Sequence, residues 1–405
     1  MYRKGEAKDK QDILDFINYV FSFADAPIDF RKVLPKAYGE NVDKEDIHHM
    51  IVDKDRIKSI VGVYPAEFVI GGVKLKTGYI GSVSVHPYAR HQGYMKELMK
   101  QVHKQMKDEE FDLAVLSGQR QRYEHYGYYR GGQRYQYQVD RTNLFHYFMN
   151  KYDVNRYHVE ETLQDHIADL ELTLKEQKSE NDTHMDAIYA LYQRQMVTGR
   201  TREGFFEDML SFGASLYAIT MHGICIGYIS INFEEEYINE MEVLDVNFLP
   251  EILYLLLEEM GSDMLGVKLS MYETQKAAFL TRICERYTIG QAQMFRIYHY
   301  PKVLKALLMA KNEMRPLQSG SFVLGVETKG KYLIEISQNA VDGMEINVLE
   351  TTRTADVRMT EEQVIRILLS TDYEQALLSG EVHGLEQIPA GWFPLPLCLN
   401  EADRF

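Results

Sequence analysis

The sequence has few cysteines, few prolines and no long apolar run. Its 405 residues include three cysteines, ten prolines and one tryptophan. Cys225, Cys284 and Cys398 are odd in number and far apart, which argues against a disulfide framework or a metal site and indicates buried thiols in a reducing compartment. The first residues, MYRKGEAKDK, lack the apolar stretch of a signal peptide, and no apolar run of about 18 residues could span a bilayer. We therefore expect a cytoplasmic protein without a metal.

Positive charge is scarce and unevenly placed. The net charge of −15 is made up of +3 over residues 1–150 and −18 over residues 151–405. Such acidity argues against nucleic acid or an anionic membrane as a partner, and it tolerates a cationic, amine-bearing substrate. An anionic ligand is easier to hold in the first 150 residues than later. With 45% hydrophobic residues, a chain of this length can form two or three globular domains.

The hydrophobic pattern predicts an α+β protein in three parts, residues 1–145, 146–300 and 301–405. The first part is predicted as a helix, then strands, a second helix and a further strand, FDLAVLSG. The middle part looks like a worn copy of that plan, with EMEVLDV, the helix FLPEILYLLLEEM and the strand DMLGVKLSM in the same order. The last part has short strands, then a helix opened by a capping box of Thr360 and Gln363. A proline-punctuated tail ends on Phe405, which indicates a terminus tucked into the fold.

The segment SVSVHPYARHQGYMKELMKQV in the first part is a strand, a basic loop and an amphipathic helix. The start of a helix offers unpaired N–H groups and the positive end of the helix dipole. Arg90 and Gly93 just ahead of it would let the main chain approach a pyrophosphate closely. The alternative for these two residues is a solvated turn. The corresponding stretch of the middle part, NFLP, lacks both arginine and glycine, so that copy is expected to keep the fold without the chemistry.

This segment resembles the Q/R-x-x-G-x-G/A motif of the GNAT acyltransferases. The resemblance implies acetyl-CoA as co-substrate, with main-chain groups around Val83 and Val85 binding its pantetheine arm. Met95 departs from the motif, because most members have Gly or Ala there. The residues that the resemblance assigns to acetyl-CoA are Val83, Ser84, Val85, Arg90, His91, Gln92, Gly93, Tyr94, Met95, Lys96, Ser117 and Gly118.

Downstream, RYEHYGY resembles the F-Y-x-x-x-G-F stretch of the same family. The matching tyrosine, Tyr123, would then protonate the departing thiolate. A phenol with an ordinary pKa of about 10 is protonated at pH 7 and can act as this acid. Tyr126 is the nearest alternative, and core packing is the other interpretation of either tyrosine.

The proton acceptor is harder to place, because the strand GYIGSVSV carries no carboxylate. Either the amine arrives deprotonated through water, or the base comes from elsewhere in the chain. The whole layout, an active GNAT module, a degenerate GNAT module and a domain like sterol carrier protein, resembles the Eis (enhanced intracellular survival) family. That resemblance implies that the α-carboxylate of Phe405 folds back as proton acceptor. From the residues alone, a frayed terminus is the alternative.

The same resemblance implies a primary amine as acceptor, either a lysine side chain or a small polyamine or aminoglycoside-like molecule, and assembly as a hexamer. Asp25 and Asp29 could contribute to the wall of the acceptor site, or be ordinary loop acids. The rival function is a non-catalytic protein that senses acyl-CoA while its last domain binds a lipid or a partner. Retention of Arg90, Gly93 and Tyr123 beside a copy that has lost them favours the enzyme.

Overall fold

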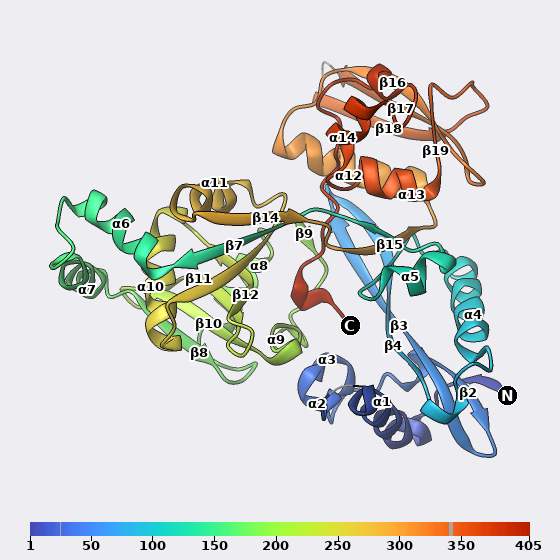
Figure 1. Ribbon diagram of the computed structural model, residues 1–405, viewed down its shortest axis with the longest axis horizontal. Helices are drawn as coiled ribbons and strands as arrows, with labels where there is room; N and C mark the ends of the chain where they lie inside the picture. Colours follow the sequence, from blue (N-terminus) through green and yellow to red (C-terminus); the bar gives the residue numbers. More distant parts are fainter. Residues whose placement is uncertain (25, 340–342) are drawn as a thin grey trace.

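The computed structural model describes residues 1–24, 26–339 and 343–405 and arranges them as an α+β protein with three sheets, of eight, seven and four strands. Each sheet belongs to one lobe of the molecule, and the chain ends between the lobes (Figure 1). In this described part of the chain, no helix is long and apolar enough to cross a membrane. The α+β class predicted from the sequence is confirmed.

The first sheet has the strand order β1-β2-β3-β4-β5-β15-β6, and a short strand, β9, is added on β3. Its β4 and β5 run parallel, whereas its other pairs are antiparallel. The predicted helices α1 (Lys10–Ala24) and α4 (Tyr94–Asp108) cover opposite faces. The strands are β1 (Tyr2–Lys4), β2 (His48–Asp53), β3 (Arg56–Ile70), β4 (Val73–Val85), β5 (Leu113–Leu116), β6 (Tyr129–Gly131), β9 (Val197–Thr198) and β15 (Gln293–Ile297).

The second sheet has the order β14-β7-β13-β12-β11-β10-β8, again with one parallel pair, β12 and β13. Its plan follows the predicted copy, since helix α10 (Leu249–Met260) joins those two strands. The strands are β7 (Arg134–Asp140), β8 (Thr173–Gln177), β10 (Ala214–Met221), β11 (Ile224–Asn232), β12 (Tyr237–Val243), β13 (Met264–Ser270) and β14 (Arg286–Gly290). The further helices are α6 (Arg141–Tyr152), α7 (Val159–Asp169), α8 (Met185–Tyr192), α9 (Phe205–Met209) and α11 (Thr274–Ile283).

The two sheets exchange strands. The predicted strand RYQYQV forms as β7, yet it pairs with β13 and β14 of the second sheet, while β15 returns to lie between β5 and β6 of the first. Gly132 turns the chain from one sheet to the other with a φ of 72°, and a Cβ there would collide with the carbonyl oxygen of Leu397. The division at residues 145 and 300 stays a prediction. Each of these two sheets, however, contains strands from before and from after residue 145.

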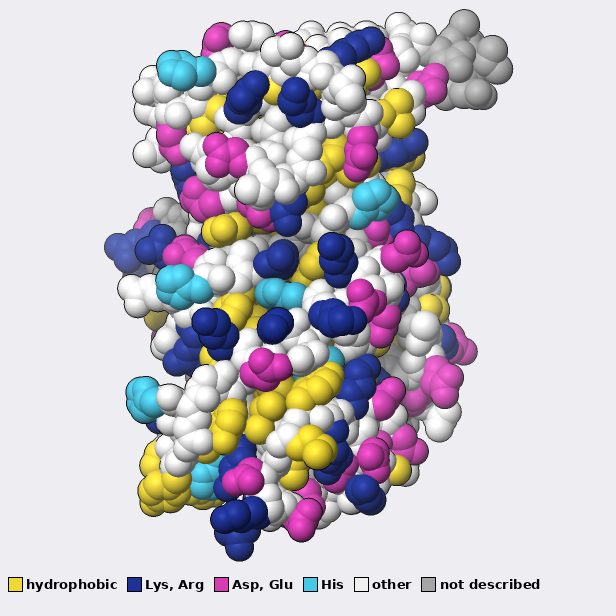
Figure 2. All heavy atoms as spheres, turned by 90° about the vertical axis from the view of Figure 1, so that its right-hand side faces the viewer, with side chains coloured by type: hydrophobic (Ala, Val, Ile, Leu, Met, Phe, Trp, Pro, Cys, Tyr) yellow, Lys and Arg dark blue, Asp and Glu magenta, His cyan; other side chains and the backbone are white. Residues whose placement is uncertain are grey.

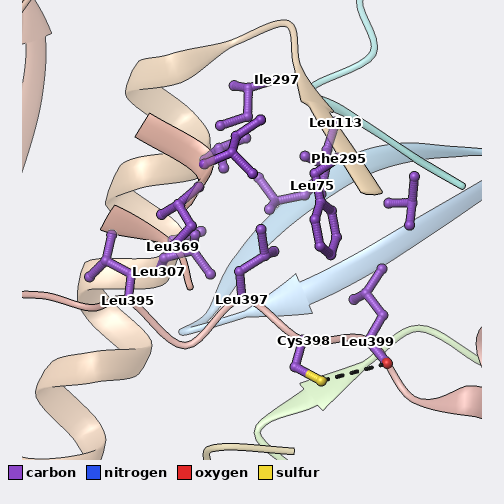
Figure 3. Close-up of a cluster of buried hydrophobic side chains, with 14 of the residues drawn as sticks. Leu75, Leu113, Phe295, Ile297, Leu307, Leu369, Leu395, Leu397, Cys398 and Leu399 are labelled. Carbon is purple, nitrogen blue, oxygen red and sulfur yellow. Dashed lines mark hydrogen bonds between the residues drawn. The ribbon is translucent and has the colours of Figure 1, made fainter. Parts of the chain in front are cut away.

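The third sheet has the order β18-β17-β16-β19. Helix α12 (Tyr300–Met314), which the sequence interpretation did not include, packs it onto the first sheet through one buried cluster of apolar side chains (Figure 3). The predicted capping box of Thr360 and Gln363 is confirmed at the start of α13 (Glu361–Gln363). The remaining elements are β16 (Gly320–Val326), β17 (Gly330–Asn339), β18 (Gly343–Glu350), β19 (Val357–Met359) and α14 (Tyr373–Ser379).

Candidate active site

The end of β4 is shaped to expose main-chain groups. Pairing between β4 and β5 stops at Ile80 and Leu116, beyond which the two strands separate. A bulge opposite Ile60–Gly62 puts Ser82 at a φ of 51° and bends the strand. The polar main-chain groups of residues 81–85 on the side of β5 are therefore open to a ligand lying in the fork.

The loop after β4 leads into a helix start that suits an anion. Gly93 precedes α4 with a φ of 79°, in the left-handed region that favours glycine, and it has no side chain with which to cap the helix. The first N–H groups of α4 are thus free to bind an anion at the positive end of the helix dipole. Arg90, His91 and Lys96 are exposed beside them. Figure 2 shows Lys and Arg side chains gathered across the middle of the face that carries α4.

A cleft of about 750 Å³ lies between the end of α1 and this loop. Six of the twelve residues predicted to bind acetyl-CoA line it, while Gln92, Gly93, Tyr94 and Lys96 continue the loop and helix beside it. Ser117 and Gly118 instead border a separate cavity of about 190 Å³ together with Glu401 and Arg404. The cleft is lined by Val20, Phe21, Phe23, Ala24, Val83, Ser84, Val85, Arg90, His91, Met95 and Arg122.

These residues fit the chemistry of acetyl-CoA. An amide-containing arm can pair with the open main chain of β4, and a pyrophosphate can bind the free N–H groups of α4. Arg90 and Arg122 place two guanidinium groups at the cleft, which suits the phosphates. Met95, which departs from the GNAT motif, is half-buried in the first turn of α4 and lines the cleft without closing it.

Tyr123 ends the short helix α5 (Arg120–Tyr123), and its ring packs directly over the Cα of Gly118. It shares a hydrophobic cluster with Val83 and Met95, although Arg122, not Tyr123, is the residue of α5 that lines the cleft. Burial raises the pKa of the Tyr123 phenol above its ordinary value of 10, and the neighbouring Arg122 opposes this shift. The phenol therefore keeps its proton at neutral pH. Burial also raises the pKa of Tyr126, which is more exposed.

The C-terminal tail is folded into the molecule, as its aromatic end indicated. An ideal Cβ placed on Gly81 would lie 3.1 Å from both the carboxyl carbon and an oxygen of Phe405, so a side chain at this position would crowd the terminus. The Phe405 ring stacks on Tyr64, with ring centroids 4.5 Å apart, and lies 5.7 Å from the ring of Tyr79. A carboxylate thus lies against the strand that has none of its own.

Buried charged residues that sequence reasoning missed hold this tail in place. Arg200 donates from Nε to Asp403 at 2.8 Å and from its terminal nitrogens to Glu240 on β12 at 2.6 and 3.0 Å. Lys36 donates to the carbonyl oxygen of Ala402 at 2.6 Å, and its Nζ lies 4.0 Å from the centre of the Phe405 ring. These residues come from distant parts of the chain, so no local pattern marks them.

The remaining tail contacts come from the second sheet and its neighbourhood. Arg134 on β7 donates to the carbonyl oxygen of Leu399 at 2.7 Å and forms a buried ion pair with Glu401. Asn400 accepts from Ser270 and Tyr272 and donates to Gln195. Glu401 also pairs with Arg404, which compensates the positive charge next to the terminal carboxylate.

A second cleft, of about 850 Å³, reaches Phe405 from the side of the second sheet. Its charged lining is mostly acidic. Asp29, one of the two acids considered for the acceptor wall, instead caps helix α2 (Phe30–Val33), and Asp25 lies outside the described residues. The carboxylates at this cleft are Glu40, Asp43, Glu67, Glu180, Glu203, Glu207, Asp208 and Asp403, against the cations Lys36, Lys44 and Arg200.

The corresponding fork of the second sheet is filled by its own side chains. Strands β12 and β13 pair only at Tyr237–Ile238 with Gly266–Val267. Beyond that point the buried Lys276 donates to the carbonyl oxygen of Met241 at 2.8 Å and pairs with Glu242 and Glu273. The main-chain acceptor in this second fork therefore already has a partner within the protein.

Comparison with known proteins agrees with this geometry. Residues 1–131 match the family model described as acetyltransferase (GNAT) domain. No curated protein matches the sequence significantly. Solved structures share the fold of the whole chain, and three of them illustrate this similarity. These are a conserved protein of Enterococcus faecalis V583 described as a probable N-acyltransferase (TM-score 0.69, 15% identity, covering 100% of this chain and 99% of that one), a GCN5-related N-acetyltransferase of Anabaena variabilis (0.67, 17%, 100% of both) and Eis1 of Mycobacterium abscessus (0.61, 11%, 100% of both).

Identities this low show a shared fold, whereas the family match bears on the first 131 residues themselves. Those residues contain the fork of β4 and β5, the free start of α4 and the buried Tyr123. The chain therefore carries a GNAT acetyltransferase domain and is an acetyltransferase enzyme.

Proposed function

We propose that the protein transfers the acetyl group of acetyl-CoA to a primary amine by direct attack of the amine on the thioester. The observation that carries this proposal is the position of the Phe405 carboxylate against Gly81. Phe405 borders the second cleft, of about 850 Å³, which we call the acidic cleft. Val83, two residues after Gly81, borders the first cleft, of about 750 Å³, which we call the basic cleft. The terminal residue thus lies between a cleft suited to an anion and a cleft suited to a cation.

In this proposal the basic cleft holds acetyl-CoA, which supplies the acetyl group as a thioester. Main-chain groups near Val83 polarise the carbonyl oxygen, as preorganised donors do in acyl transfer. The Phe405 carboxylate removes the proton that the amine nitrogen loses when the new C–N bond forms. Tyr123 gives a proton to the sulfur as the C–S bond breaks.

The acidic cleft points to the class of acceptor. Its carboxylates surround the approach to Phe405 and outnumber the nearby cations. A molecule with several ammonium groups can pair with more than one of them while a further amine reaches the terminal carboxylate. We therefore propose a small polyamine or aminoglycoside-like molecule as acceptor. A lysine side chain is the alternative acceptor, because it offers the same primary amine.

The organisation that accompanies this activity rests on the resemblance to the Eis family. On that basis we propose a catalytic GNAT module over residues 1–145, a degenerate one over 146–300 and a sterol-carrier-protein-like domain over 301–405. The filled fork at Lys276 supports the assignment of acetyl-CoA to the first module alone. We further propose a homo-oligomer, a hexamer by family analogy, that works in the cytoplasm.

The test is to incubate the full-length protein with acetyl-CoA and a panel of amines, and to measure both free CoA thiol and the mass of each amine. The expected result is thiol release together with a product one acetyl group heavier. The matched control is the same polyamine with every nitrogen fully methylated, which keeps the positive charge but has no N–H to replace. Binding of acetyl-CoA without thiol release for any amine would support an acyl-CoA sensor instead.

A further inference from the structure

Three hydroxyl groups and one imidazole form a buried chain beside the end of β4. The Tyr38 hydroxyl, on helix α3 (Pro35–Tyr38), lies 2.5 Å from the Tyr64 hydroxyl and 2.6 Å from Oγ of Ser82. Tyr64 and Ser82 are themselves 2.6 Å apart. Tyr38 also lies 2.9 Å from Nε2 of His48. All four side chains are buried, with exposed fractions of 1 to 8%.

The hydrogen atoms in this chain have one consistent direction. Nδ1 of His48 lies 3.2 Å from the carbonyl oxygen of Glu45, which can only accept, so Nδ1 carries the proton. In the neutral ring Nε2 then accepts from the Tyr38 hydroxyl. With its proton directed to His48, Tyr38 accepts from a neighbouring hydroxyl, and the order Ser82 to Tyr64 to Tyr38 gives each hydroxyl proton one acceptor. The hydroxyl protons are thus oriented towards His48, and the chain has its accepting end at β4.

The two ends of the chain lie at different places in the molecule. The accepting end is at Ser82, next to Gly81, against which the Phe405 carboxylate lies, and the Tyr64 ring stacks on that of Phe405. The other end, His48, lines a cavity of about 340 Å³ between α1 and the segment after α3. Exposed residues also line this cavity, among them Gln11, Arg31 and Glu40, so it reaches the surface. It does not include Phe405 among its lining residues.

We propose that the chain from Ser82 and Tyr64 through Tyr38 to His48 carries the excess proton of an ammonium acceptor away from the Phe405 carboxylate. This inference rests on the proposed amine acetylation. An ammonium ion and acetyl-CoA give an amide, CoA thiol and one proton. The ammonium nitrogen loses two protons: one replaces the proton that Tyr123 gives to the thiolate, and the other must leave the site. Each hydroxyl passes its own proton onward and accepts the next. His48 accepts a proton at Nε2 and loses the one on Nδ1 to water in the cavity, after which the ring and the hydroxyls return to their starting orientation.

The surroundings of His48 fit a group that holds this proton only briefly. Burial lowers its pKa to about 4, while main-chain contacts with Glu45 and Lys44 act in the opposite direction. The ring is therefore neutral at pH 7 and ready to accept. The charged and titratable groups facing it are Lys44, Glu45 and Asp46 on its own segment, His49 on β2, and Lys10, Arg31 and Glu40 around the cavity.

The decisive variant is Tyr38→Phe, which breaks the chain and keeps the ring that packs against Phe30. With an aliphatic diamine at pH 7, we expect kcat to fall by about 10- to 100-fold and the KM for acetyl-CoA to stay within twofold. As the pH rises through the pKa of the diamine, the ratio of wild-type to variant kcat should return towards one. A neutral amine carries no excess proton, so it does not need the chain.

Two further variants make the test specific. Ser82→Ala removes the hydroxyl at the other end of the chain and is the alternative variant if Tyr38→Phe alters the fold. Its ratio of wild-type to variant kcat should depend on pH in the same way. Tyr300→Phe is the control, because Tyr300 is buried and its hydroxyl has no hydrogen-bond partner among the described residues. It should match the wild type at every pH.

A loss of kcat in Tyr38→Phe that is equal at low and high pH would overturn the relay alone. Absence of turnover by the wild type with every amine would overturn the proposed function as well.

Discussion

At the scale of single residues, the proposed acid, Tyr123, lies within the residues that match the GNAT domain, and the chain terminus brings a carboxylate to the same lobe. Tyr123 is buried over Gly118, and the Phe405 carboxyl group occupies the space that a side chain at Gly81 would fill. The motif around Tyr123 was visible in the sequence because it is contiguous. Gly81 gave no such signal, since its role depends on a residue more than three hundred positions away.

Replacing Tyr123 with phenylalanine removes the proposed proton donor and keeps the buried ring. We expect kcat to fall by about 10²- to 10⁴-fold while the affinity for acetyl-CoA is nearly unchanged. Steady-state kinetics together with a direct binding measurement would check this. Wild-type turnover in this variant would instead assign the donor role to Tyr126, which Tyr126→Phe would test in parallel.

Lys36 makes the stability of the protein depend on pH. Burial lowers its pKa from 10.5 to about 8, although Asp208 and Asp403 oppose the shift. Between pH 8 and 10.5 the unfolded chain therefore binds more protons at this residue than the folded protein does, so stability rises with pH in that window. Relative to Lys36→Met, the free energy of unfolding of the wild type should increase by up to about 3 kcal/mol from pH 8 to 10.5. Denaturant unfolding at several pH values measures this, and parallel pH profiles for the two proteins would contradict it.

At the scale of elements, contiguous patterns were predictable and long-range pairing was not. The turn from β4 into α4 was foreseen because Arg90, Gly93 and the amphipathic helix adjoin one another. Helix α12 was overlooked even though Val303, Leu304, Leu307 and Leu308 have helical spacing. The exchange of β7 and β15 between the sheets could not be foreseen, because a strand pattern does not say which neighbour the strand will join.

The tail is the element on which the proposed chemistry depends, and Asp403 is its clearest anchor. Asp403→Asn should loosen the tail while Arg200 keeps its pair with Glu240. We expect kcat to fall by about tenfold with the affinity for acetyl-CoA unchanged. Carboxypeptidase should also release Phe405 faster than from the wild type. Glu381→Gln, which removes an ion pair with Arg366 in the third lobe, is the matched control. Unchanged kcat and unchanged release of Phe405 would count against the anchoring role.

At the scale of the whole molecule, the second lobe and its neighbourhood hold the chain terminus against the first lobe. The tail is contacted by Arg134 on β7 and by Ser270 on β13. It is also contacted by Arg200, which pairs with Glu240 on β12. The order of strands and helix in the second lobe was recognisable from the sequence, but the contacts of this lobe with the tail were not, since they join residues far apart in the chain. Because its own fork is filled by Lys276, its clearest contribution to the first lobe is the position of the tail.

The central claim is that the Phe405 carboxylate accepts the proton of the attacking amine. The most direct measurement compares acetyl transfer by the natural chain with that of the same chain ending in a C-terminal amide, which removes the charge and keeps every atom of the side chain. We predict that the amide lowers kcat by at least about 100-fold, with the affinity for acetyl-CoA and the melting temperature unchanged. Full activity of the amide would contradict the claim.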